Sequence, residues 1–171
     1  MVGLLHSESS LWWEALRVII QGNPRFIIIE NPEGLIARGL REVLASLRMA
    51  GYSWDDPQLV PAFAIGSPQI RKRLFIVSYS NGVMAGWTQP PTRWGEQVNH
   101  MVEKERTSRV WIGFERRDSG VTARFPEGMD ANFGVKPRTG KHLRRRKLLG
   151  RSVIPEQAAI ALRRVLYLSQ L

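Results

Sequence analysis

A chain of 171 residues can bury one substantial hydrophobic core, and its apolar share of 43% is that of a globular protein rather than a disordered one. Its formal charge of +10 at pH 7 indicates a polyanionic partner, most often nucleic acid. The sequence has no cysteine, which excludes disulfides and thiolate chemistry supplied by these residues, and its three histidines lack metal-ligand spacing, which argues against zinc.

The same sequence argues against a membrane protein. No apolar run approaches the roughly 20 residues that cross a bilayer, and the N-terminus lacks the basic and apolar regions of a signal peptide. No predicted helix combines a basic face with a strongly apolar one. We therefore expect a cytoplasmic protein, associated with the nucleoid where it binds DNA.

The first fifty residues alternate between helix and strand. A helix that ends at Gly22-Asn23-Pro24 is predicted by a stripe of Leu11, Trp12, Ala15, Leu16, Ile19 and Ile20. A second helix, with Gly51 as its stop, is predicted by Ile36, Leu40, Val43, Leu44 and Leu47. The intervening run from Phe26 to Ile29 is typical of a central strand in a parallel sheet. This order predicts an α/β fold whose crossovers make the sheet parallel.

A polar turn ends this first strand. Because Pro32 cannot donate to a sheet ladder, we expect the strand to stop by Asn31. Glu30 and Asn31 then lie at the carboxyl end of a buried strand, where open α/β sheets place their ligands. Taken by themselves, these residues favour an ordinary strand end followed by a turn.

Residues 59–65 and 74–79 predict two further strands. Pro61 argues for an edge position or a late start of the first, and Gly66-Ser67-Pro68 ends it. The second strand follows almost at once, so the pair predicts a hairpin with an unusually basic connection.

Three side chains in that connection alternate along the chain. In an extended segment Gln69, Arg71 and Arg73 project to one side, which suits a planar hydrogen-bonding target. A solvated loop explains the same residues equally simply.

Residues 80–140 change character, because glycine, proline, tryptophan and charge dominate and hydrophobic periodicity is weak. A helix over residues 95–106 is the clearest element that we expect there. We interpret the region as an irregular module inserted into or appended to the α/β part.

Residues 136–151 contain eight basic side chains and no acid. These are Lys136, Arg138, Lys141, Arg144, Arg145, Arg146, Lys147 and Arg151. Such a run binds phosphate or is merely solvated, and the charge of the whole chain favours contact with nucleic acid.

A closing helix follows, with Pro155 in its first turn. We expect its buried stripe to consist of Ala158, Ala159, Leu162, Val165 and Leu166.

Four features now stand in one order. They are a strand ending Glu30-Asn-Pro-x-Gly34, a helix ending near Gly51-Tyr52, the segment Gly66-Ser-Pro-Gln-x-Arg-x-Arg73, and Leu149-Gly-x-Ser-Val-Ile-Pro-x-Gln-Ala158 before the last helix. In this order they resemble the DNA cytosine-C5 methyltransferases, which have Glu-Asn at a strand end, then Gln-x-Arg-x-Arg, a variable target-recognition region and a closing Gly-Asn-Ser-Val-x-Pro segment. The resemblance covers roughly residues 9–79 and 141–168.

The resemblance implies a domain organisation. Residues 1–80 would form part of a Rossmann-like methyltransferase core with a parallel-type sheet, and residues 81–140 a target-recognition-like region. Residues 141–171 would add the basic segment and a closing helix that packs on the core.

The resemblance also implies roles for individual residues. In this family an extruded cytosine is attacked at carbon 6 by a thiolate, and a carboxyl group that donates to N3 draws electrons through the ring. Glu30 would be that group, and Arg73 would contact O2, where negative charge develops. Asn31, Gln69 and Arg71 would support the base and its loop, Ser152 would lie against the cofactor pocket, and the basic run from Lys136 to Lys147 would meet phosphates.

The sequence departs from the family in ways that limit this chemistry. The glycine-rich cofactor loop, the acidic ribose-binding strand and the Pro-Cys loop have no counterpart in it, and the family's Gly-Asn is Gly150-Arg151. Without cysteine the covalent step has no nucleophile. We therefore expect a truncated chain that is inactive alone and uses S-adenosylmethionine only when a partner chain completes it.

Three functions are compatible with these residues. The first is a methyltransferase-derived protein that acts in DNA binding or regulation. The second is one subunit of a split methyltransferase, and the third is a basic structural component of a nucleic-acid assembly. Because a sheet without its first strands exposes an apolar edge, we also expect a protein partner or self-association to cover it.

Overall fold

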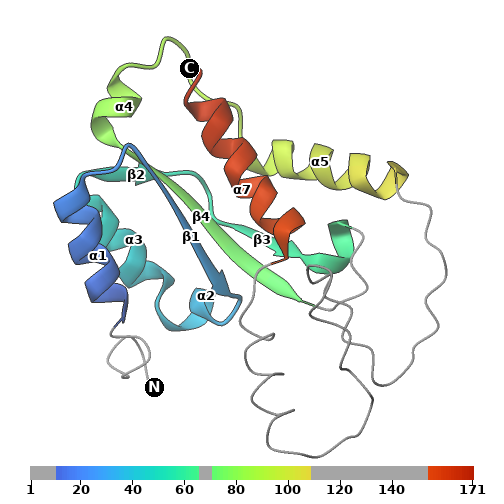
Figure 1. Ribbon diagram of the computed structural model, residues 1–171, viewed down its shortest axis with the longest axis horizontal. Coiled ribbons are helices and arrows are strands. Elements are labelled where there is room, and N and C mark those ends of the chain that lie inside the picture. Colours follow the sequence, from blue (N-terminus) through green and yellow to red (C-terminus); the bar gives the residue numbers. More distant parts are fainter. Residues whose placement is uncertain (1–10, 66–70, 109–153) are drawn as a thin grey trace, which may run out of the picture.

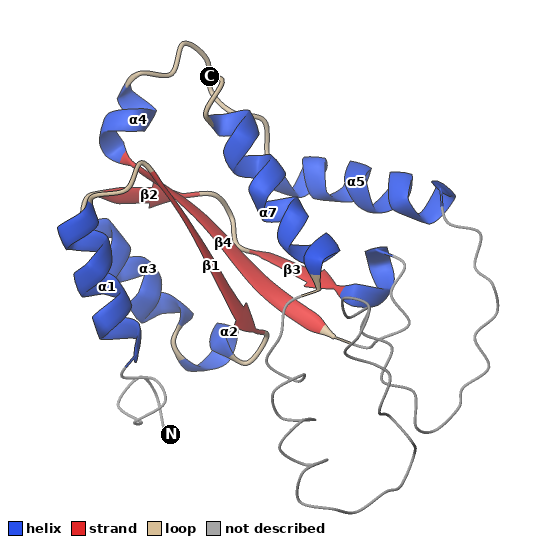
Figure 2. Ribbon diagram, in the orientation of Figure 1, coloured by secondary structure: helices blue, strands red, loops and turns tan. Residues whose placement is uncertain are grey.

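The computed structural model describes residues 11–65, 71–108 and 154–171 (Figure 1). In these ranges the chain forms a mixed α/β structure, in which a four-stranded sheet is packed between two sets of helices (Figure 2). No helix in the described part of the chain is both long and apolar enough to span a membrane.

Strand β4 (Lys72–Ser80) is the centre of this sheet. It pairs on one side with β1 (Phe26–Pro32) and on the other with β2 (Tyr52–Trp54) and β3 (Gln58–Pro61). All three pairings are antiparallel. The long apolar β4 is buried at seven successive positions, as expected of a strand covered on both faces.

The expectation of a parallel sheet with β1 at its centre is therefore wrong for the described strands. The helical crossover after β1 does return the chain in the same direction, because β1 and β2 both run antiparallel to β4. The β3–β4 hairpin, however, inserts β4 between them, so no parallel neighbours remain. β1 also runs through Pro32, one residue further than expected, which an edge position tolerates.

One face of the sheet packs against the N-terminal helices. Helix α1 (Leu11–Gly22) and helix α3 (Leu40–Met49) enclose a cluster that contains Ile27 of β1 and Ile76 of β4. The predicted second helix is divided at Gly39, where α2 (Leu35–Arg38) ends and α3 begins. Gly51, the predicted stop, adopts φ of +86°, a left-handed conformation that favours glycine.

Helix α1 forms as predicted, but its apolar stripe is only partly covered. Trp12 and Ile19 pack against the core, and the Trp12 indole N–H donates to Ser46 Oγ at 3.1 Å. Leu11 and Ile20, which we expected to be buried, are 70% and 59% exposed. They flank the buried stripe on opposite sides of the helix, beyond the reach of α3.

The other face of the sheet carries the C-terminal helices. Phe75 and Val77 of β4 pack with helix α5 (Trp94–Ser108) and helix α7 (Pro155–Leu168), and Trp94 is one of the largest fully buried side chains. Helix α5 confirms the helix expected over 95–106, and α7 begins at Pro155 as predicted.

The buried face of α7 differs from the expected one. The helix buries Gln157, Ile160, Ala161, Arg164 and Leu168. Leu162 and Leu166, which were predicted to be inside, are 55% and 61% exposed. The prediction considered apolar residues only. It failed because two polar side chains of α7, Gln157 and Arg164, form hydrogen bonds inside the protein.

Three short elements were not predicted. The segment expected to be a strand over 59–65 continues after β3 as a 3₁₀ helix, η1 (Ala62–Ile65), and β2 precedes it. Helix α4 (Asn81–Ala85) follows β4 and is capped by the Ser80 hydroxyl, which accepts from the Val83 N–H. The division of the chain at residues 80 and 140 stays a prediction, because most of 81–140 lies outside the described residues.

Candidate functional site

The ends of β1 and β4 bring a carboxylate and a guanidinium together. In the antiparallel register Glu30 lies opposite Phe75, so Glu30, Phe75 and Arg73 project to the same face, the one that α7 covers. Arg73 Nε lies 2.6 Å from Glu30 Oε1. The Arg73 side chain is 8% exposed and that of Glu30 24%, so the guanidinium is enclosed while a ligand can still reach the carboxyl group.

Burial sets the protonation of this site. Desolvation raises the pKa of Glu30 above its ordinary value, and the nearby charges of Arg73 and Arg71 oppose that rise without cancelling it. Burial also lowers the pKa of Arg71 from its ordinary high value. Glu30 therefore keeps its proton to a higher pH than an exposed glutamate, which is what a proton donor requires.

The remaining side chains at this end of the sheet lie elsewhere. Asn31 pairs in register with Leu74 and projects to the opposite face of β1, away from Glu30. Glu33 lies 3.3 Å from Lys72 Nζ in an exposed ion pair beside the site. Of the predicted site residues, the structure thus brings Glu30, Arg71 and Arg73 together and separates Asn31 from them.

Several predicted site residues lie outside the described part of the chain. They are Gln69, Ser152 and the basic residues Lys136, Arg138, Lys141, Arg144, Arg145, Arg146 and Lys147. Their roles in loop support, cofactor contact and DNA binding remain predictions.

Gln157 is a residue near this site that we did not predict. Its side chain is fully buried, and its amide nitrogen donates to the carbonyls of Val60 at 2.7 Å and Arg71 at 3.1 Å. It thereby joins the first turn of α7 to β3 and to the residue that precedes β4. Gln157 belongs to the Pro-x-Gln-Ala motif of the sequence. It was not predicted to be buried because the buried face of the helix was predicted from apolar residues alone.

Arg164 holds α7 at a second point, two turns further on. Its guanidinium donates to both carboxylate oxygens of Asp55, at 2.7 and 3.0 Å. It also donates to Gln97 Oε1 and to the Thr92 carbonyl, each at 2.8 Å. We call Arg164, Asp55, Gln97 and Thr92 the arginine clamp; it fixes α7 to the segment after β2 and to the start of α5.

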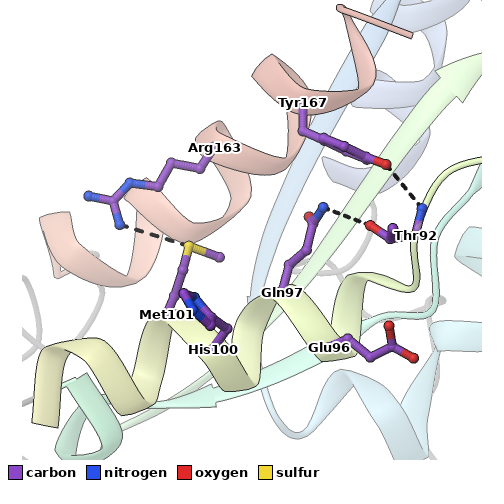
Figure 3. Close-up of a pocket in the computed structure, with 7 residues that line it drawn as sticks. All are labelled: Thr92, Glu96, Gln97, His100, Met101, Arg163 and Tyr167. Carbon is purple, nitrogen blue, oxygen red and sulfur yellow. Dashed lines mark hydrogen bonds between the residues drawn. The ribbon is translucent and has the colours of Figure 1, made fainter.

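A cavity of about 430 Å³ lies between α5 and α7, apart from Glu30 (Figure 3). Its lining residues are Thr92, Glu96, Gln97, His100, Met101, Arg163 and Tyr167. The Tyr167 hydroxyl accepts a hydrogen bond from the Thr92 N–H at 3.1 Å, and hydrogen bonding to Thr92 lowers the pKa of this phenol. Within the described ranges, no group of His, Asp and Glu side chains could hold a metal ion.

Comparison with known proteins identifies the family. A family model described as C-5 cytosine-specific DNA methylase matches residues 2–125. The chain is 30% identical over 86 residues to the type II methyltransferase M.AluI of Cellulosimicrobium cellulans, an alignment that covers 44% of this chain and 16% of that protein. It is 31% identical over 81 residues to the type II methyltransferase M2.ScrFI of Lactococcus lactis subsp. cremoris, covering 44% of this chain and 22% of that one.

The alignments therefore span less than a quarter of these two relatives, whereas the family model extends over more than two thirds of the chain. On the strength of that match, the chain belongs to the C-5 cytosine-specific DNA methylase family.

Proposed function

We propose that this chain binds DNA and receives an extruded cytosine against Glu30 and Arg73, without methylating the base by itself. The observation that supports this most directly is the partly buried pair at the ends of β1 and β4, in which the pKa of Glu30 is raised beside Arg73. A planar guanidinium and a protonated carboxyl group together match the O2 and N3 edge of cytosine.

Each side chain would perform one step of recognition. Protonated Glu30 would donate to N3, and its second oxygen could accept from the exocyclic amine. Arg73 would donate to O2, where negative charge collects when a nucleophile attacks the ring. Since the 171 residues contain no cysteine, a thiolate for that attack would have to come from another segment or chain.

The methyl donor of this family is S-adenosylmethionine. Neither the cavity of about 430 Å³ nor a second of about 360 Å³ includes Glu30 or Arg73 in its lining, so neither would hold this donor against the candidate pair. Ser152, the one residue we expected at that cofactor, is not among the described residues. We therefore derive no step of the reaction through it.

Phosphate contact would supply most of the affinity. The net charge of +10, and the basic run from Lys136 to Lys147 in particular, would neutralise backbone phosphates. Such contacts carry no sequence information, so they position the duplex while Glu30 and Arg73 read the base.

The test compares duplexes that differ at one cytosine. One duplex holds the cytosine opposite an abasic site, so that extrusion is easy, and the other is fully paired. We expect tighter binding to the first duplex. In Glu30→Ala the ratio of the two affinities should fall by roughly 5- to 150-fold, which is the discrimination that a pair of hydrogen bonds to one base provides. Glu33→Ala, which removes an exposed carboxylate beside the site, is the matched control and should keep it.

Two results would contradict the proposal. The first is equal affinity of the unsubstituted chain for the two duplexes, and the second is an unchanged preference in Glu30→Ala. A steep salt dependence without preference for the unpaired cytosine would favour a basic structural component of a nucleic-acid assembly instead.

The sheet edge favours a second candidate, a subunit of a split methyltransferase. Among the described strands β1 pairs only with β4, so its other edge carries no strand there. Beside it Ile28 is 37% exposed, and α1 exposes Trp13, Val18 and Ile20. Such an apolar edge invites a further strand, from a partner chain or from a second copy.

Two measurements test this candidate. Sedimentation should show self-association or a stable complex with a chain that carries the Pro-Cys loop, and a monodisperse monomer in that mixture would count against it. If such a complex forms, it should transfer methyl groups to cytosine, and the Glu30→Ala complex should not. A complex without methyl transfer would leave the DNA-binding function and eliminate the split enzyme.

A further inference from the structure

Helix α7 contacts the main chain of the segment that contains Arg71 and Arg73. The carbonyl of Arg71 accepts two hydrogen bonds, from the Ala62 N–H at 2.7 Å and from the Gln157 amide at 3.1 Å. The same amide donates to the carbonyl of Val60, which lies opposite Arg73 in the β3–β4 register. One buried side chain thus connects β3 to the residue that precedes β4, two positions before Arg73.

We infer that Gln157 is a positioning residue, which holds the end of β3 and the start of β4 together so that Arg73 stays directed at Glu30. The inference rests on the proposed function of that pair, but the geometry it concerns can be measured without DNA.

The clamp further along α7 makes this role mechanically possible. Gln157 and Arg164 lie seven residues apart on the same face of the helix, and Arg164 is fixed to Asp55. The helix therefore cannot rotate freely, and the Gln157 amide keeps its place against the hairpin. Both of its N–H donors face main-chain carbonyls, so the orientation of the amide is set by its partners.

The position of Gln157 near the start of α7 also links that end of the helix to the candidate site. It lies in the first turn of α7, which begins directly after Ile154, the first described residue that follows Ser108. A displacement of that first turn would move the Val60 and Arg71 carbonyls, to which Gln157 donates, and would therefore shift Arg73 as well. Gln157 thus couples the entry of α7 to the base-binding pair.

The experiment follows the Arg73 Nε–H signal in ¹⁵N-labelled protein across a pH titration. Because Nε lies against the Glu30 carboxyl, its shift should report the titration of Glu30, and Glu30→Gln should abolish that step and so assign it. Gln157→Met keeps a side chain of similar length without donors, and we expect the step to be lost in it. Gln97→Met, which removes a hydrogen bond to Arg164 away from the site, should retain the step.

A role of Gln157 in stability alone would affect both methionine variants similarly and leave the Arg73 titration intact in whatever protein is folded. Retention of the step in Gln157→Met would therefore overturn the inference. If that variant does not fold, Gln157→Ala removes both donors and leaves room for water at the two carbonyls; the step should be lost there too, and its retention would overturn the inference equally. A chain with no preference for unpaired cytosine but with these titrations as expected would refute the proposed function and leave the positioning role standing.

Discussion

Removing Asp55 from the arginine clamp should destabilise the fold more than any exposed charge does. The Arg164 side chain is 0% exposed and that of Asp55 10%, so Asp55→Ala leaves a guanidinium buried without its counter-charge. Two of the four hydrogen bonds that Arg164 makes disappear with the carboxylate. Breaking a buried pair in this way costs about 3–5 kcal/mol.

That loss is large enough to be measured in two ways. Urea unfolding should show a lower midpoint with the same slope, and for a chain of this size the melting temperature should fall by roughly 6–20 °C. The matched control is Glu14→Ala, which breaks an ion pair with Arg17 whose side chains are 66% and 57% exposed. Its expected cost is below about 1 kcal/mol.

A double-mutant cycle sharpens the test. Arg164→Met combined with Asp55→Ala removes both charges, so the pair should be less destabilised than the sum of the two single variants by about 0.5–3 kcal/mol. An Asp55→Ala chain within about 1 kcal/mol of the unsubstituted protein would refute the reasoning. So would strict additivity in the cycle, because it would mean that the two side chains do not act together.

Three further predictions concern stability. At pH values between the ordinary and the raised pKa of Glu30, the folded chain keeps a proton that the unfolded chain has lost, so the free energy of unfolding falls as pH rises. Urea unfolding at a series of pH values should show this decrease, and Glu30→Gln should remove it. The same pH dependence in both proteins would contradict the raised pKa. Gly51→Ala should cost about 1–2 kcal/mol by thermal melting because φ is +86°, whereas Gly22→Ala, with open space at its Cβ, should cost nothing; equal effects would refute the strain argument. Leu168→Ala should cost about 2–5 kcal/mol and the exposed Leu162→Ala under about 0.5, and the reverse order would show that α7 buries the face expected from its sequence.

The strand ends that carry Glu30 and Arg73 could be predicted from the sequence because their signals are local. An apolar run followed by Glu30 and a proline defines a strand end whatever the sheet around it, and Arg73 follows from a short basic connection before another apolar run. Burial at the end of this apolar strand is the leading cause of the raised pKa of Glu30.

The sheet order could not be obtained in the same way. Helical crossovers correctly implied that β1 and β2 run in the same direction, yet nothing local states that β4 inserts between them. That insertion depends on pairing between residues far apart in the chain, such as Glu30 with Phe75. Strand order is a property of these long-range pairs.

The face of α7 was mispredicted for a different reason. Apolar periodicity assumes that polar side chains stay outside, and Gln157 and Arg164 are inside because Val60, Arg71 and Asp55 offer them partners. Those partners lie about a hundred residues earlier in the chain, so no window along the helix reveals them. Buried polar residues of this kind are the ones that connect the helix to the site.

In the proposed function, Glu30 donates its proton in a hydrogen bond to a bound cytosine. The most direct measurement compares duplexes with a single cytosine or a single thymine opposite an abasic site, at neutral and at mildly acidic pH. The N3 atom of cytosine accepts a hydrogen bond and so requires the protonated carboxyl group, whereas the N3–H of thymine can donate to the carboxyl group in either protonation state. We therefore predict that the affinity for cytosine relative to thymine grows as pH falls toward the raised pKa of Glu30 and does not depend on pH in Glu30→Gln. A ratio of the two affinities that is the same at both pH values in the unsubstituted chain would contradict the proposed role of Glu30.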